Sequence, residues 1–148
     1  LPMPAAAALF SSYTTEVQGD SVFVRGRIGG LLPAPSGTQP PPTRSFGYFS
    51  ETRPDDPAVL PSLSPETLAA FPPTLLITGS RAFDLSPAAR THLDLVKAGV
   101  DARLYVWDGV DHCFTYNASL RESQEAYAIT ARFFDEGMDL AEKRTNSQ

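Results

Sequence analysis

A strand, a helix and a second strand follow one another within about 35 residues, and this succession limits the folds open to the chain. The segment Thr74–Gly79 is apolar and β-branched, is entered through two prolines and ends at glycine, which is typical of a strand. Ala102–Trp107 alternates well enough for another strand, and Ser86–Ala98 has the apolar spacing of a helix. Strands joined by such a crossover are parallel and the connection is right-handed. The sequence therefore predicts the α/β class.

The predicted helix between these strands carries its own start signal. Ser86 stands where an N-cap is needed, and Pro87 stands at the first helical position. Ala89, Leu93 and Val96 follow at the spacing of one helical face. We expect that face to be buried against the sheet.

Further segments complete a three-layer parallel-sheet half-domain. The apolar run Met3–Ser12 suits a strand covered on both faces, although its alanine content also permits a short helix. Ser64 followed by proline predicts a short helix over Pro65–Ala70. A capping sequence at Ser119–Glu122 predicts a last helix over Leu120–Ala141. Its expected core-facing residues are Ala126, Ile129, Phe133 and Leu140.

Length and composition indicate one domain over residues 1–148. Of the 148 residues 42% are apolar and 20% are charged, as in globular proteins. The net charge of −5 comes without a basic cluster, which argues against nucleic acid as a partner. We expect a surface loop over Leu31–Thr43 and a frayed polar tail over 143–148. The longest early apolar run, Ala5–Phe10, is too short to span a bilayer, and the cytoplasm is the default compartment.

His112 is the most informative single residue, because it lies in the loop immediately after the second predicted strand of the parallel pair. Loops at the carboxyl ends of parallel strands are where open α/β sheets place their sites. A histidine there reaches groups on neighbouring strands while it stays close to water. The alternative is a loop histidine that makes only a structural hydrogen bond.

The order of these segments resembles the end of bacterial esterases of the hormone-sensitive-lipase-like group of α/β-hydrolases. The matching features are the strand with its Gly79-Ser80-Arg81 turn, a helix that ends in Lys97-Ala98-Gly99, and the Asp-Gly-x-x-His-x-Phe sequence of Asp108–Phe114. The resemblance covers most of the chain. It implies carboxylic-ester hydrolysis, with short acyl chains favoured, through a serine acyl-enzyme and without a metal or organic cofactor.

By this resemblance His112 is the general base of a serine triad. The group usually places the triad aspartate where this sequence has Ala82, and Asp84 is the nearest carboxylate of the same turn. We expect Asp84 to accept the Nδ1 proton of His112. Asp108 and Asp111 are weaker candidates, because a side chain directly before the histidine must fold back to reach it. The alternative for Asp84 is a solvated aspartate near a helix N-terminus.

The nucleophile elbow G-x-S-x-G of this fold is missing. The nearest imitation surrounds Ser21, but Phe23 stands where the second glycine belongs, and Gly29-Gly30 has no preceding histidine for an oxyanion hole. The sequence also begins at Leu1 without methionine, so we expect a fragment or processed product that is inactive alone. Its expected partner is the N-terminal half of the hydrolase as a second chain, or otherwise a second copy through the open edge of the first strand. The rival hypotheses are a non-catalytic homologue and a small α/β binding module.

Several other residues have structural explanations. His92 is expected at the boundary of the first long helix, and Tyr105 and Trp107 are expected in the core. Cys113 occupies a position that is commonly glycine in the group, and as the single cysteine it forms no internal disulfide. An aromatic cluster after the proline-rich loop could line an acyl pocket or form a satellite core: Phe46, Tyr48 and Phe49.

Overall fold

A three-stranded parallel sheet forms the centre of the computed structural model, which describes residues 3–28, 51–53 and 55–146. Its strands are β1 (Ala7–Phe10), β2 (Thr74–Gly79) and β3 (Ala102–Trp107), in the order β1-β2-β3. Every residue of β2 is buried, because this strand is paired on both sides. The predictions for all three strands are confirmed, although the first is shorter than Met3–Ser12.

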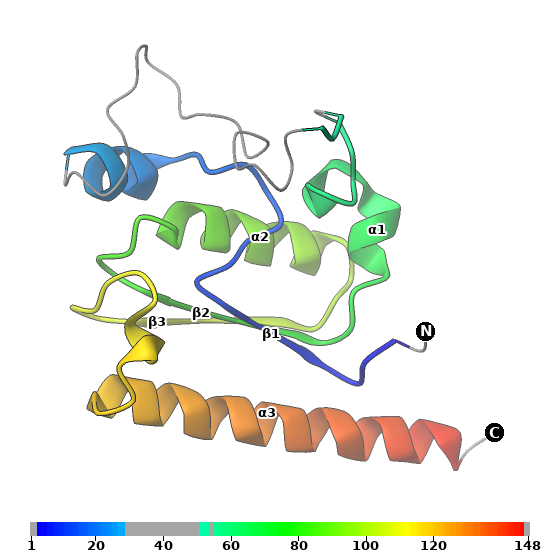
Figure 1. Ribbon diagram of the computed structural model, residues 1–148. Coiled ribbons are helices and arrows are strands. Elements are labelled where there is room, and N and C mark those ends of the chain that lie inside the picture. The colour runs from blue at the N-terminus through cyan, green and yellow to red at the C-terminus, as the bar shows by residue number, and fades with distance from the viewer. Residues whose placement is uncertain (1–2, 29–50, 54, 147–148) are drawn as a thin grey trace.

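Helices cover both faces of the sheet and give the predicted three layers (Figure 1). Helices α1 (Pro65–Ala69) and α2 (Leu85–Lys97) lie on one face, and α3 (Arg121–Thr145) crosses the other. Shorter helical turns are η1 (Val22–Ile28), η4 (Pro61–Leu63) and η5 (Phe114–Tyr116). Within the described ranges, no helix combines the length and apolar character that crossing a membrane requires.

Alternate side chains of β2 feed two hydrophobic clusters, as expected for a strand covered on both faces. Leu75 and Ile77 point to the α3 side, where they join Phe133. Leu76 points to the other side and joins Leu68 of α1 and Leu95 of α2. The strand is thus held from both faces, and its carboxyl end has a fixed position.

The face that α2 buries differs from the prediction. Leu93 and Val96 are each 47% exposed, and Ala89 is exposed too, so the expected face is wrong. The Thr91 hydroxyl accepts a hydrogen bond of 2.9 Å from the Thr14 N–H, which turns a polar residue inward. The buried residues of the helix are Pro87, Ala88, Thr91 and Leu95.

The last helix also departs from the prediction at its C-terminal end. Leu140 is 48% exposed, so its expected core position is wrong. Gly137 is buried instead, and a Cβ at this position would lie 2.9 Å from that of Ala6. Close approach of the chain before β1 therefore selects glycine here. The predicted frayed tail from residue 143 is also wrong in part, because the helix continues to Thr145.

The short helix α1 follows its sequence signals. The Ser64 hydroxyl accepts from the Thr67 N–H at 3.0 Å, which is the N-cap bond that the serine-proline pair predicts. The predicted loop Leu31–Thr43, Gly29-Gly30 and the aromatic residues Phe46, Tyr48 and Phe49 lie outside the described residues.

Candidate active site

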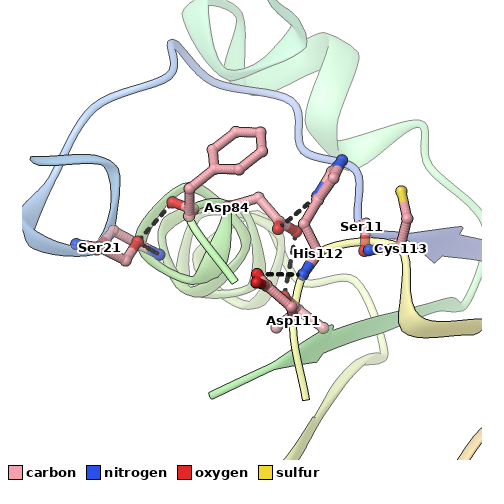
Figure 2. A network of polar contacts seen from close by, with 9 residues as sticks. Ser11, Ser21, Asp84, Asp111, His112 and Cys113 are labelled. Carbon is pink, nitrogen blue, oxygen red and sulfur yellow. Dashed lines mark hydrogen bonds and ion pairs between the residues drawn. The ribbon is translucent and has the colours of Figure 1, made fainter. Parts of the chain in front are cut away.

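His112 and Asp84 are in direct contact at the carboxyl ends of β2 and β3 (Figure 2). The His112 Nδ1 lies 2.8 Å from Asp84 Oδ1. The Asp84 side chain is fully buried, whereas the His112 side chain is 32% exposed. An imidazole held by a buried carboxylate on one nitrogen and open to solvent elsewhere can exchange protons with a neighbouring molecule.

Asp84 is placed by the start of α2. It is the N-cap residue of that helix, but its side chain makes no capping hydrogen bond. Its Oδ1 contacts His112, and its Oδ2 accepts from the Thr78 hydroxyl at 3.1 Å. The positive end of the helix dipole also favours a negative charge at this position. Both carboxylate oxygens are therefore paired although the group is buried, as a buried charge requires.

Ser21 provides the cap that Asp84 does not. The Ser21 Oγ accepts from the Ser86 N–H at 2.8 Å and donates to the Phe83 carbonyl at 2.7 Å. The prediction that Ser86 caps the helix is therefore wrong. Figure 2 shows Ser21 on the opposite side of Asp84 from His112. Its hydroxyl joins the residue before η1 to the start of α2.

The loop that carries His112 is docked on the turn after β2. The Arg81 N–H donates to the Val110 carbonyl at 3.1 Å. Gly79 allows this close approach, because a Cβ there would lie 2.2 Å from the Val110 oxygen. The Ser80 hydroxyl accepts from the Gly109 N–H at 2.8 Å and donates to Asp108 at 2.9 Å. Asp108 therefore serves the loop rather than the imidazole.

The imidazole of His112 is also held from its ring face and its backbone. Its centroid lies 4.5 Å from that of the Phe83 ring. The His112 N–H donates to the Asp111 carboxylate at 2.7 Å, so Asp111 contacts the backbone and not the ring. Within the described part of the chain, no hydrogen bond reaches the Nε2 of His112.

Cys113 follows His112 in a left-handed backbone conformation, with φ at 57°. Its N–H donates to the Ser11 hydroxyl at the end of β1. The position at which the resembling esterases commonly carry glycine is therefore one that favours glycine. The site thus draws on the carboxyl ends of all three strands.

Sequence reasoning missed several residues near the pair, among them Thr78, Phe83 and Tyr13. Burial raises the pKa of the Tyr13 phenol, and the negative charges of Asp84 and Glu16 raise it further. The signal for Thr78 was available, since a hydroxyl in a buried strand needs a partner.

The remaining candidates lie away from the pair. His92 Nε2 is 3.1 Å from the Ala102 carbonyl, which suits the expected boundary position. Trp107 packs on the core residue Phe114, as expected. Tyr105 is 39% exposed and lines a cavity of about 140 Å³ between β3 and α3, so its core assignment is wrong. Within the ranges described, no group of three or more His, Cys, Asp and Glu residues could hold a metal ion.

The fold defines the class: three parallel strands with helices on both faces match the C-terminal part of the α/β-hydrolase fold. Solved esterases match this arrangement over nearly the whole chain. Esterase E25 matches with a TM-score of 0.68 and 28% identity over 91% of this chain. An esterase of the bacterial hormone-sensitive lipase family matches with a TM-score of 0.72 and 26% identity over 92%. EstE5 matches in fold, with a TM-score of 0.73 and 24% identity over 93%.

The predicted resemblance to hormone-sensitive-lipase-like esterases is confirmed by these structures. The chain spans only 41%, 44% and 45% of the three matched chains, as expected of a C-terminal half. Comparison with protein-family models and with curated proteins gave no match.

Proposed function

We propose that this chain is the acid–base segment of a serine carboxylesterase of the α/β-hydrolase type. His112 is the general base, and Asp84 orients it. The contact of 2.8 Å between His112 Nδ1 and the buried Asp84 carboxylate carries this proposal. The esterase structures that match the chain support the reaction class.

In the proposed mechanism each imidazole nitrogen has a separate role. Asp84 accepts a hydrogen bond from Nδ1, so Nδ1 carries the proton and Nε2 presents its lone pair. In the proposed reaction a serine hydroxyl adds to the ester carbonyl while Nε2 takes its proton, and Asp84 stabilises the imidazolium. The tetrahedral intermediate expels the alcohol, which receives that proton from Nε2. A water molecule then cleaves the acyl-enzyme by the same proton transfers.

The proposed nucleophile and oxyanion hole come from an N-terminal half. Ser21 is unsuited to the role, because its hydroxyl is already bonded to Phe83 and Ser86. Within the described sheet, β1 pairs only with β2 and leaves its other edge open for a further strand. We propose that the N-terminal half binds at this edge, and that the chain self-associates there when this half is missing. Esters with short acyl chains are the proposed substrates.

Complementation tests the proposal. The chain is assayed with a short-chain p-nitrophenyl ester, alone and after co-expression with the polypeptide encoded directly upstream. We expect no hydrolysis by the chain alone and turnover by the pair. Asp84→Asn in the pair should lower turnover roughly 10⁴-fold. Asp111→Asn is the matched control and should leave turnover nearly unchanged, because among the described residues the Asp111 carboxylate bonds the His112 backbone N–H and not the ring.

A non-catalytic homologue is the second candidate, and Ala82 favours it. This residue is fully buried at the position that usually bears the triad aspartate. A pair that assembles and binds the ester without turnover would support this reading. Turnover by the wild-type pair that is lost in Asp84→Asn would exclude a non-catalytic homologue. It would show that Asp84, two residues after Ala82, acts as the triad acid.

A further inference from the structure

We propose that Thr78 is a positioning residue for the acid–base pair. Its hydroxyl fixes the Asp84 carboxylate and thereby sets the tautomer and orientation of His112. The inference rests on the proposed function, since it concerns the same pair. It goes beyond that function by assigning a role to a residue that acts on the imidazole through Asp84.

The carboxylate of Asp84 has one hydrogen-bond partner on each oxygen. Oδ1 faces His112 Nδ1 at 2.8 Å, and Oδ2 accepts from Thr78 Oγ1 at 3.1 Å. Thr78 and Asp84 are both fully buried. The two residues are six positions apart in the sequence. Their bond joins the C-terminal part of β2 to the N-cap residue of α2.

The torsion that turns an aspartate carboxylate is soft and roughly two-fold, so one hydrogen bond does not fix its plane. A second bond on the other oxygen does. Since the cap position leaves the Asp84 side chain without a capping bond, Thr78 supplies this second anchor. Loss of the hydroxyl leaves a buried oxygen of the carboxylate unpaired, which drives the carboxylate to turn. This change weakens its hold on the Nδ1 proton.

The same strand contains a second buried threonine that serves as a comparison. Thr74 is also fully buried, and its hydroxyl donates to the Pro72 carbonyl at 2.7 Å. Both residues occupy β2, one at each end. Only Thr78 reaches the acid–base pair, so a substitution at Thr74 matches it in residue type, strand and burial.

Nitrogen-15 NMR of the imidazoles in the 148-residue chain tests the proposal without ester turnover. The readouts are the tautomer of His112 and the solvent-exchange rate of its Nδ1 proton. We expect Thr78→Val, which keeps the shape and removes the oxygen, to accelerate that exchange at least about tenfold, the factor that one hydrogen bond to a charged group corresponds to. Thr78→Ser, which keeps the oxygen and removes a methyl group, should restore the wild-type rate. Thr74→Val should leave the signal unchanged, as should the His92 signal in every variant.

The outcomes separate the two proposals. An unchanged His112 signal in Thr78→Val, or a loss in Thr78→Ser equal to that in Thr78→Val, overturns the role of Thr78 and leaves the His112–Asp84 pair intact. Both proposals are overturned if His112 of the wild type carries no Nδ1 proton. They are also overturned if the His112 signal is the same in Asp84→Asn as in the wild type. If Thr78→Val does not fold, Thr78→Ser and Thr78→Ala differ by the same oxygen and decide the question.

Discussion

Ser11 and Cys113 lie 102 residues apart in the sequence, and a hydrogen bond of 2.9 Å joins the Cys113 N–H to the Ser11 hydroxyl. Their φ angles are 49° and 57°, in the left-handed region that L-residues rarely adopt. Because Cys113 follows His112 directly, this bond holds a strained turn beside the imidazole. Strain of this kind persists where the surrounding structure over-determines it.

Cys113→Gly should relieve part of this strain. Left-handed backbone costs an L-residue roughly 1–2 kcal/mol, and the extra freedom of glycine in the unfolded chain offsets about 0.5–1 kcal/mol of the gain. We expect the free energy of unfolding in urea to rise by up to about 1 kcal/mol. Ser11→Ala should lower it by about 1 kcal/mol through loss of the bond. A glycine variant that is less stable than the wild type would contradict the strain argument.

Gly79→Ala should disturb the docking of the His112 loop. The new Cβ would meet the Val110 carbonyl at 2.2 Å, so the loop or the strand has to move. Overpacking of this kind costs about 1–3 kcal/mol. We expect faster amide exchange over residues 108–113 in hydrogen-exchange measurements. Gly99→Ala is the control, because nothing lies within 4 Å of its Cβ and only its φ of +84° is unfavourable. In Gly99→Ala the amides of residues 108–113 should exchange as fast as in the wild type.

Ser21→Ala should weaken the start of α2 without touching the acid–base pair. It removes the hydroxyl that bonds Phe83 and Ser86, and loss of a helix cap costs about 0.5–2 kcal/mol. Circular dichroism during urea unfolding measures this loss. Ser119→Ala is the control: the predicted cap at Ser119 is wrong, because α3 begins only at Arg121 and the Ser119 hydroxyl bonds no group among the described residues. This substitution at an exposed serine should change stability by less than about 0.5 kcal/mol. Labelling of Ser21 by a fluorophosphonate would reveal a reactive nucleophile and contradict the capping role.

Tyr13 should make the folded state sensitive to alkaline pH. Burial first, and then Asp84 and Glu16, raise the pKa of its phenol in the folded protein. The folded state therefore holds this proton more tightly than the unfolded chain does. The resulting stabilisation is complete below the ordinary tyrosine pKa of about 10 and is lost as the pH rises through the folded value.

Tyr13→Phe removes this contribution, so its free energy of unfolding should fall less steeply than that of the wild type above about pH 10. Tyr116→Phe is the matched control, because Tyr116 is 86% exposed. Urea unfolding at a series of alkaline pH values gives the comparison. Parallel plots of unfolding free energy against pH for wild type and Tyr13→Phe would contradict the raised pKa of the Tyr13 phenol.

The strands were predictable because their signals are local. Thr74–Gly79 and Ala102–Trp107 have the bounds that the apolar runs and their flanking prolines and glycine indicated. The juxtaposition of His112 and Asp84 also followed, since carboxyl ends of adjacent parallel strands meet at one edge. Family resemblance supplied the choice of these two residues.

The helix faces were not predictable from periodicity alone. In α2 the apolar residues Leu93 and Val96 stay exposed, while Thr91 turns inward to accept a bond from the distant Thr14. In α3 the buried residue near the C-terminal end is Gly137, against which Ala6 packs closely, and Leu140 is exposed. At the start of α2 the capping hydroxyl comes from Ser21 and not from the predicted Ser86, for a similar reason. Each depends on a partner far away in the sequence, which a local pattern does not contain.

The single tryptophan of the chain is an intrinsic fluorescent probe close to the site. Trp107 ends β3, packs on Phe114 just beyond the histidine loop, and donates its indole N–H to Glu125 of α3 at 3.3 Å. Indole emission responds to local polarity, and no second indole masks it. Arrival of a second chain or a ligand at the strand ends could therefore be followed in the unlabelled protein by its fluorescence.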